Sequence, residues 1–264
     1  MRKIIYGISL LILTFFSFFY TDKVINIINK KDPLMDKIVS VKDSYNVIPV
    51  DGMIKENTII PGIYGREVDT EKSYNNMKLG GVFREEALVF KDLSPDNLLI
   101  NNKNKFIVKG NSTKKEVAIL FVFNNNYKDS LKKYNDITIF FDHNDLNIAN
   151  INFFKDNEIY TYGDHGIYNH EILVSDNALI NRISKNKSIY CLVKEKNEDI
   201  LNICNDNDMY IVLPNIIGDY YEVKEKISNG SIILLNNLKD IDIIIRYIES
   251  KGYDIVSLNN LLNE

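Results

Sequence analysis

The sequence predicts an α/β protein, namely a distorted (β/α) barrel preceded by a small α+β module and an N-terminal transmembrane helix. Three observations predict this organisation. An uncharged apolar run occupies residues 4–20. Short β-prone runs separated by turn residues fill residues 36–110. From residue 115 onward, apolar strand-like runs alternate with helical patterns, which is typical of parallel strands connected by helices.

The apolar run near the N-terminus predicts a membrane anchor over residues 1–22. It follows Arg2 and Lys3 and has about the length that spans a bilayer. The basic start predicts that the N-terminus stays in the cytoplasm, so we expect a single-pass protein of the cell membrane with its C-terminal domain outside. A cleaved secretory signal is the alternative, but the run is long for a signal core and no small-x-small cleavage pattern follows.

Residues 23–35 are polar and contain Pro33, which suits a linker. The module then expected over residues 36–110 has one helix, stopped by Gly80 and Gly81. Its β-prone runs are residues 45–50, 57–68, 85–90 and 104–110. In this module Arg66, Ser73 and Tyr74 could serve a ligand, although a structural role is the simpler interpretation.

The barrel is expected over residues 111–264. Its predicted strands are residues 116–123, 136–141, 157–163, 188–194, 208–214, 230–236 and 253–258. Helical patterns are clearest over residues 197–206 and 238–252, the second ending at a glycine C-cap, Gly252. In such folds function lies at the carboxyl ends of the strands. We therefore expect one rim to gather the residues that follow the strands, which are Asn124, Asp142, His165, Lys194, Pro214 and Asn236.

Charge and cysteine content limit the kind of partner. The net charge is -4 and the lysines are scattered among acids, so no basic stripe indicates nucleic acid. Cys191 and Cys204 are the only cysteines. In an extracytoplasmic chain they could form a disulfide, but two small buried apolar side chains are the favoured interpretation.

Residues 115–264 resemble the catalytic domain of polysaccharide deacetylases, the NodB-homology or carbohydrate esterase family 4 group. The resemblance is carried by "KKEVAILFVFNNN", "ITIFF", "DNEIYTYGDHGIYNHEIL" and "NGSIILLNN" followed by "IIRYIESKGYDIVSLNNLL". It implies a NodB-like barrel that removes acetyl groups from glycan. It also implies a divalent metal, usually zinc, held by one Asp and two His, with a second Asp as general base and a late His as general acid.

The sequence departs from this pattern at the positions that carry the chemistry. The paired acids fall on Val122 and Phe123, which can neither ligate a metal nor take a proton. The late histidine falls on Asn236, whose amide does not titrate. The arginine-proline motif meets "CLVKEK", where Lys194 is the nearest cation. We therefore assign no catalytic residue and expect no bound cofactor unless the metal site is functional.

The histidines leave a metal site open. The chain has three, and the octapeptide "GDHGIYNH" holds His165 and His170. The family spaces its two ligand histidines four residues apart, whereas these are five apart, an interval that on a helix separates side chains by about 140°. A loop could still bring both inward beside His143 or Asp142, which would form a relocated ligand set for zinc or another divalent metal. The favoured alternative is a relic loop whose histidines are solvated.

These observations predict a membrane-anchored, extracytoplasmic deacetylase-like protein that acts on or binds cell-wall or extracellular polysaccharide, with lost or much reduced activity. Two alternatives stay open. One is an active metal-dependent glycan N-deacetylase with relocated ligands. The other is a structural partner of another cell-envelope protein, which the sequence does not identify.

Overall fold

The computed structural model describes residues 12–17, 20–21, 32–184 and 187–264. The apolar run over residues 4–20, expected to form the membrane anchor, lies largely outside these ranges. Within them, no helix combines the length and the apolar character needed to cross a membrane.

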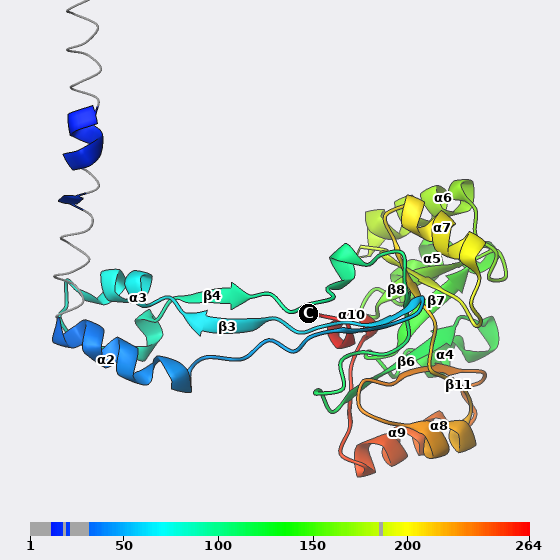
Figure 1. Ribbon diagram of the computed structural model, residues 1–264. Coiled ribbons are helices and arrows are strands. Elements are labelled where there is room, and N and C mark those ends of the chain that lie inside the picture. The colour runs from blue at the N-terminus through cyan, green and yellow to red at the C-terminus, as the bar shows by residue number, and fades with distance from the viewer. Residues whose placement is uncertain (1–11, 18–19, 22–31, 185–186) are drawn as a thin grey trace, which may run out of the picture. The chain divides into compact units, whose positions relative to one another are not determined.

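The chain divides into two compact units, drawn in Figure 1. The first comprises the residues up to Pro49 together with Tyr64–Ser94, and the second comprises Val50–Ile63 and Pro95–Glu264.

The first unit packs two helices against each other beside a two-stranded antiparallel sheet. Its elements are α2 (Pro33–Val41), η1 (Lys42–Ser44), β3 (Gly65–Val68), α3 (Thr70–Met77), η2 (Glu85–Ala87) and β4 (Phe90–Leu93), with β3 and β4 antiparallel. Leu34 and Ile38 of α2 are buried against Met77 of α3. Asp32 caps α2 by accepting a hydrogen bond from the Leu34 N–H at 2.8 Å.

The three ligand candidates in this unit have structural partners. The Ser73 hydroxyl accepts a hydrogen bond from the Val89 N–H at 2.9 Å. The Tyr74 hydroxyl donates to the Asp32 carboxylate at 2.9 Å. The Arg66 guanidinium lies 4.6 Å from the centre of the Phe90 ring. These contacts account for all three residues without a ligand.

The second unit contains two sheets whose strands curve into a distorted barrel. One sheet has the order β11-β12-β6-β7-β8, with β13 beside the start of β6, and its pairs are all parallel. Its strands are β6 (Glu116–Val122), β7 (Thr138–Asp142), β8 (Ile159–Gly163), β11 (Ile216–Gly218), β12 (Ile232–Leu235) and β13 (Asp254–Ile255).

The other sheet has the order β1-β2-β5-β10-β9. Its strands are β1 (Met53–Lys55), β2 (Thr58–Ile60), β5 (Phe106–Ile107), β9 (Tyr190–Leu192) and β10 (Tyr210–Val212). All pairs but the β1–β2 hairpin are parallel. The hydroxyl of Tyr168 joins the sheets, because it contacts the Thr161 carbonyl in β8 and both backbone groups of Leu192 in β9.

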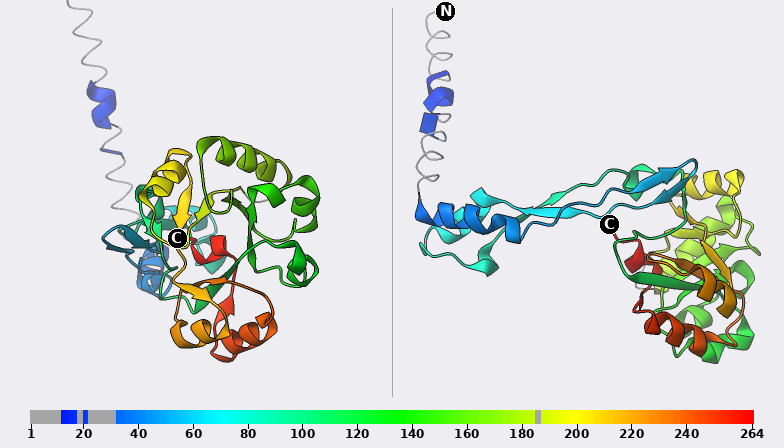
Figure 2. Two further views of the ribbon diagram at one scale, coloured as in Figure 1. Left: turned by 90° about the vertical axis from the view of Figure 1, so that its right-hand side faces the viewer. Right: turned by 60° about the horizontal axis from the view of Figure 1, so that its bottom comes forward.

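Helices lie around the outside of these strands, as the left view of Figure 2 shows. They are α4 (Lys128–Leu131), α5 (Ile148–Phe153), α6 (His170–Ile183), α7 (Glu198–Asp206), α8 (Tyr220–Lys226) and α9 (Ile241–Ser250). The last helix, α10 (Leu258–Leu261), instead packs Leu258 and Leu261 with the interior residues of the barrel. Short 3-10 turns η4 (Asn125–Tyr127) and η5 (His143–Asp145) precede α4 and α5, and η3 (Leu99–Asn101) precedes β5.

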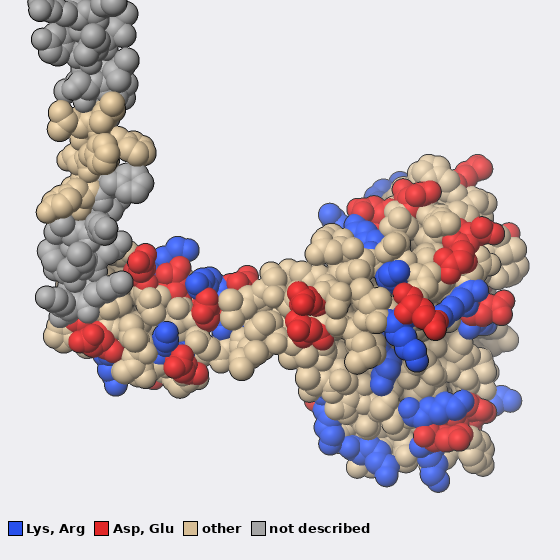
Figure 3. All heavy atoms as spheres, viewed as in Figure 1, with Lys and Arg blue, Asp and Glu red and all other residues tan. Residues whose placement is uncertain are grey.

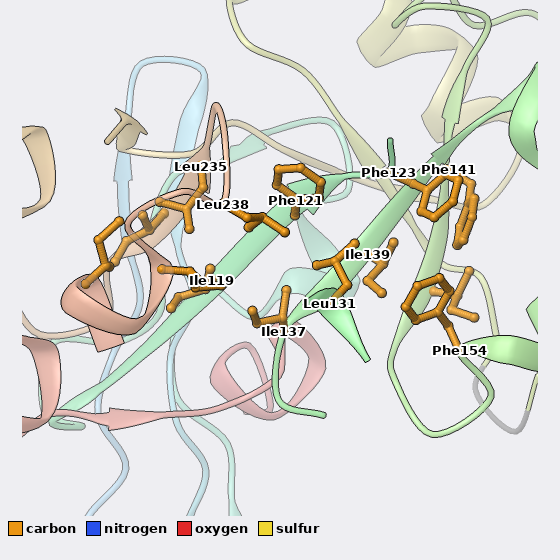
Figure 4. Close-up of a cluster of buried hydrophobic side chains, with 14 of the residues drawn as sticks. Ile119, Phe121, Phe123, Leu131, Ile137, Ile139, Phe141, Phe154, Leu235 and Leu238 are labelled. Carbon is orange, nitrogen blue, oxygen red and sulfur yellow. The ribbon is translucent and has the colours of Figure 1, made fainter. Parts of the chain in front are cut away.

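Strand β6 explains why residues 116–123 form a continuous apolar run. Successive side chains of a strand point to opposite faces. Ile119 and Phe121 pack with the helices, whereas Ala118 and Leu120 pack with interior residues from both sheets. Figure 4 shows the buried cluster on the helix side of the sheet, where Phe121 and Phe123 lie among apolar side chains from neighbouring elements. A strand buried on both faces needs apolar residues at every position.

The barrel strands predicted from the sequence are confirmed, most of them shortened by one to three residues at their ends. The N-terminal half of the chain differs more from the strands predicted for it. Residues 45–50 make only isolated bridges at Val47 and Val50, and residues 85–90 begin with a 3-10 turn. Strands β2 and β5, expected in the small module, and β1, which was not predicted, belong to the sheet of the second unit, because β5 pairs in parallel with β10.

The favoured interpretation of the cysteines was wrong. Cys191 in β9 and Cys204 in α7 form a disulfide. The apolar face of α7 packs over β9, which brings the two Cα atoms to 6.5 Å, within the range that a disulfide spans.

Candidate functional site

The carboxyl ends of the parallel strands meet at one edge of the first sheet. Leu235 of β12 pairs with Phe121 of β6, and Val122 pairs with Phe140 of β7. Asp142 at the end of β7 pairs with Gly163 at the end of β8. The predicted rim therefore exists in this sheet, where Asn124, Asp142, His165 and Asn236 end or follow neighbouring strands.

Asp142 is the best-connected polar side chain of this rim. It is only 7% exposed. One carboxylate oxygen accepts hydrogen bonds from the backbone and side-chain N–H groups of Asn144, both at 3.1 Å. The other accepts from the His165 N–H at 2.7 Å. Burial by itself raises the pKa of Asp142, but the backbone N–H groups of Asn144 and His165 outweigh it and hold that pKa below its ordinary value.

The loop after β8 places His165 against this carboxylate. His165 has a φ of 53°, in the left-handed region that non-glycine residues seldom occupy, and Gly163 and Gly166 flank it with φ values of 68° and 85°. Its Nδ1 lies 2.8 Å from the Asp142 carboxylate, and its Nε2 lies 3.8 Å from Asp164. The Asp142 contacts, to the backbone and to the ring, therefore fix a strained residue in one orientation.

His143 and His170 do not join this pair. The Nδ1 of His143 lies 2.7 Å from a carboxylate oxygen of Asp176, a buried residue of α6. The other oxygen of Asp176 accepts a hydrogen bond from the Thr161 hydroxyl at 2.6 Å. His170 is exposed and is the first residue of α6, after the N-cap Asn169.

In the described part of the chain, one group of His, Cys, Asp and Glu side chains could hold a metal ion. It consists of Asp142, Asp164 and His165, whose ligand atoms lie within 4.8 Å of one another. The group shares Asp142 and His165 with the set predicted from the sequence. It contains Asp164 in place of His143 and His170.

The residues at the positions of the family's paired acids and late histidine can neither bind a metal ion nor transfer a proton. Phe123 is buried, with its ring stacked on Phe141 at 4.5 Å between centroids and edge-on to Phe154 at 5.7 Å (Figure 4). Val122 packs against the barrel interior. Asn236 is exposed, and its backbone N–H bonds the Gly218 carbonyl at 3.1 Å. The family's metal site, as implied by the resemblance, therefore lacks its strand-end ligand in this chain.

A groove opens beside His165, between the ends of β8 and β9 and the start of α7. Its volume is about 310 Å³, at the lower end of the roughly 300–1,000 Å³ typical of small-molecule sites. It brings together the predicted rim residues His165 and Lys194. The lining residues are Tyr162, His165, Gly166, Ile167, Leu192, Val193, Lys194, Glu195, Asn197 and Ile200.

Sequence reasoning missed several polar residues of this region. Asp164 belongs to the octapeptide that holds His165 and His170. Its position next to His165 was the signal that could have identified it as a candidate ligand. Asp176 lies in a helix that was not predicted in detail, so its contact with His143 had no signal. Tyr162 and Glu195 enter the groove because β8 and β9 lie side by side, which the sequence does not reveal.

The fold is that of carbohydrate esterase family 4, the NodB-like fold that the resemblance implied. Wild-type BA3943 from Bacillus anthracis, described as a CE4 family pseudoenzyme, superposes with a TM-score of 0.63 at 23% identity, covering 89% of this chain and 96% of that chain. PdaA from Bacillus subtilis, a family 4 carbohydrate esterase, superposes with a TM-score of 0.50 at 18% identity, covering 62% and 87%.

One curated relative spans nearly the whole chain. It is the uncharacterized protein YlxY from Bacillus subtilis (strain 168), 26% identical over 273 residues, which covers 89% of this chain and 85% of YlxY. No family model matches the sequence.

Proposed function

We propose that the protein is a polysaccharide deacetylase-like protein of the cell envelope that binds glycan and has lost most or all deacetylase activity. The observation that carries this proposal is the apolar character of the strand-end acid positions. Phe123 is part of the core between Phe141 and Phe154, so its position can supply neither a ligand nor a base.

Hydrolysis of an acetamide needs an activated water, a general base and a proton donor for the leaving amine. General acid–base catalysis alone contributes about 10²- to 10⁴-fold, and groups that act as a unit lose activity together. Val122, Phe123 and Asn236 remove both proton-transfer partners that the family uses. BA3943, of the same fold, is itself described as a pseudoenzyme, and one mutant of it as having restored enzymatic activity.

Glycan binding is supported by the groove next to His165. It combines the Tyr162 ring and apolar side chains with a few charged and polar groups, the composition typical of a small-molecule site. Tyrosine offers an apolar face together with a polar edge, which suits a sugar ring.

Location at the outer surface of the membrane is supported by two features. Arg2 and Lys3 precede the apolar run over residues 4–20, in the order expected for an anchor with its N-terminus inside. The Cys191–Cys204 disulfide suits an oxidising compartment.

The test is co-sedimentation of the purified protein with insoluble acetylated and deacetylated glycan, with the released acetate measured in the same tube. We expect retention on glycan without acetate release. Loss of retention in a variant that blocks the groove, such as Gly166→Trp, would locate the binding site. Absence of retention on every glycan would overturn the proposal.

The second candidate function is an active metal-dependent N-deacetylase with relocated ligands. It is favoured by the proximity of Asp142, Asp164 and His165. These three residues would hold the ion, which when bound would supply a Lewis acid for the acetamide carbonyl. Metal analysis of the purified protein tests this function. It requires that the wild type contains one equivalent of zinc and that the His165→Ala variant has lost it.

A further inference from the structure

We propose that a cavity at the amino ends of the strands, here called the amino-end cavity, is a second glycan-binding site and takes a neutral sugar chain. The inference rests on the proposed glycan binding for the class of ligand and assigns that ligand a separate site. Asp136 and Ile137 of the cavity wall directly precede β7, and Asp254 begins β13, which pairs with the first residues of β6.

The amino-end cavity is larger than the groove beside His165 and lies apart from it. Its volume is about 450 Å³, within the range typical of small-molecule sites, whereas that of the groove is about 310 Å³. Strand β6 has seven residues, so at about 3.3 Å per residue its two ends lie roughly 20 Å apart. One sugar unit therefore does not fill both sites.

The walls of the amino-end cavity are held in place from inside the protein. The side-chain nitrogen of Asn157, a residue that is 3% exposed, lies 2.7, 3.4 and 3.2 Å from the carbonyl oxygens of Tyr134, Asn135 and Ile137. The opposite wall includes α9, whose Ile244 is part of the buried cluster. A preformed cavity loses little conformational freedom when a ligand binds.

Two tyrosine rings offer surfaces on which a sugar ring can stack. Tyr134 and Tyr253 line the amino-end cavity together with Ile245 of α9. Burial, and then a hydrogen bond to Asp242, raise the pKa of Tyr134 to about 12, so its hydroxyl stays protonated and donates to that carboxylate. Within the described part of the chain the Tyr253 hydroxyl forms no hydrogen bond, so it remains available to a ligand.

Three carboxylates of the lining have acceptor oxygens to offer. Asp136, Glu249 and Asp254 are exposed, and among the described residues their side chains accept no hydrogen bond and pair with no cation. Sugar hydroxyls are donors, and hydrogen bonds to an ionised acceptor are stronger than those between neutral groups. The cation of the lining is Lys133, so the ionised lining groups carry a net charge of -2, which disfavours an anionic chain.

The experiment is calorimetric titration of the full-length chain, in detergent, with the neutral tetramer of N-acetylglucosamine and the anionic tetramer of galacturonic acid. Wild type and Tyr162→Ala are compared, because Tyr162→Ala removes the aromatic ring of the groove beside His165 and leaves the amino-end cavity intact. In Tyr162→Ala we expect the neutral tetramer still to bind, at least about fivefold more tightly than the anionic one at low salt. The difference should shrink at high salt, because exposed charges are screened.

Variants of the amino-end cavity locate this binding. Tyr253→Ala should weaken binding of the neutral tetramer at least about fivefold, since a stacking surface is lost. Tyr221→Ala is the matched control, because Tyr221 is 76% exposed and lines neither site, and it should bind as wild type does.

A second pair of variants changes charge at the surface and leaves the core untouched. Glu249→Gln replaces an exposed carboxylate of the lining by an amide of the same shape, so it should raise the affinity for the anionic tetramer about threefold at low salt. Glu225→Gln on α8 removes an exposed charge outside the lining and should leave that affinity unchanged.

The outcomes distinguish this inference from the proposed function. Binding of the neutral tetramer to wild type that disappears in Tyr162→Ala, or that is unaffected by Tyr253→Ala, would overturn the second site while glycan binding stands. Equal affinity for the two tetramers in Tyr162→Ala, unaffected by Glu249→Gln, would overturn the selection of neutral chains. Absence of tetramer binding to wild type would also overturn the inference, whereas the proposed function depends on co-sedimentation with insoluble glycan.

Discussion

At the scale of single residues, the two lost acid positions lie in different environments. Val122 belongs to the interior side of β6 and is half-buried, whereas Phe123 lies on the helix side in contact with Phe141 and Phe154. Val122 and Phe123 both stand where the family has an acid, but they contribute differently to the stability of the fold.

Replacing these residues by aspartate tests that difference. Phe123→Asp should lower the free energy of unfolding by at least about 4 kcal/mol, because it removes a buried ring and buries a charge. Val122→Asp should cost less than about 2 kcal/mol. Urea denaturation of both variants measures the comparison. Equal destabilisation would show that Phe123 is not a core residue.

Asp142 makes stability depend on pH. Its folded pKa is lowered, so its contribution is fully present above the ordinary aspartate pKa of about 3.9 and is lost as the pH falls through the folded value. The unfolding free energy of wild type should therefore exceed that of Asp142→Asn at pH 6, with the gap closing below about pH 4. A gap that stays constant between pH 6 and pH 3 would contradict this assignment.

The sequence identified part of the candidate site and could not identify the rest. His165 and Asp142 stood out because each follows an apolar strand, and parallel strands end at one edge. The pairing of His143 with Asp176 depends on how α6 lies on the sheet, which periodicity does not report. The absence of the acids was visible only through the family resemblance, because Val122 and Phe123 in isolation are ordinary strand residues.

At the scale of elements, the Tyr168 hydroxyl bridges the seam between β8 and β9, where the Tyr160 and Tyr190 rings also pack edge to face with 5.2 Å between their centres. No backbone pairing joins these two strands, and the buried Tyr168 hydroxyl bonds the Leu192 N–H at 3.0 Å and contacts the Leu192 and Thr161 carbonyls at 3.0 and 3.3 Å. Burial raises the pKa of this hydroxyl, so it remains protonated and can donate.

Tyr168→Phe should therefore destabilise the protein by about 2–3 kcal/mol, because buried backbone groups lose their partner. Tyr221→Phe is the matched control, since Tyr221 is 76% exposed, and it should change stability by less than about 0.5 kcal/mol. Thermal denaturation of the two variants measures the effect. Equal melting temperatures would mean that the seam does not need this hydroxyl.

The disulfide joins β9 to α7 across the segment that forms one wall of the groove. It closes a loop of 13 residues, for which the chain-entropy estimate is about 3 kcal/mol. The double variant Cys191→Ala/Cys204→Ala should lose about this much stability and bind glycan more weakly. Thiol titration of the unfolded, unreduced wild type should find no free cysteine, and two free thiols would contradict the bond.

The barrel strands were predictable because strands buried on both faces require unbroken apolar runs, as in β6 and β7. In the N-terminal half the predicted runs over residues 57–68 and 104–110 contain β2 and β5, whereas β1 was not predicted, and all three strands have only two or three residues. Their assignment to the second unit results from long-range pairing of β5 with β10, which local sequence does not encode. The disulfide was missed for a similar reason, since it depends on how α7 packs on β9.

At the scale of the whole molecule, the second unit keeps the fold of carbohydrate esterase family 4 without the acids that the family uses at its strand ends. Acidic and basic side chains are interspersed on the face of the second unit seen in Figure 3, as on an ordinary solvated surface. The distinctive chemistry is confined to the strand-end rim, where His165 and Asp142 remain and the acid positions are apolar. Recognition without turnover is what this combination supports.

The most direct test of this account is the rate of acetate release from acetylated chitooligosaccharide and peptidoglycan fragments, with PdaA assayed beside the protein and with zinc added or removed. We expect a rate at least about 100-fold below that of PdaA, unchanged by zinc and by His165→Ala. A rate comparable to that of the active enzyme, dependent on zinc and abolished by His165→Ala, would contradict it.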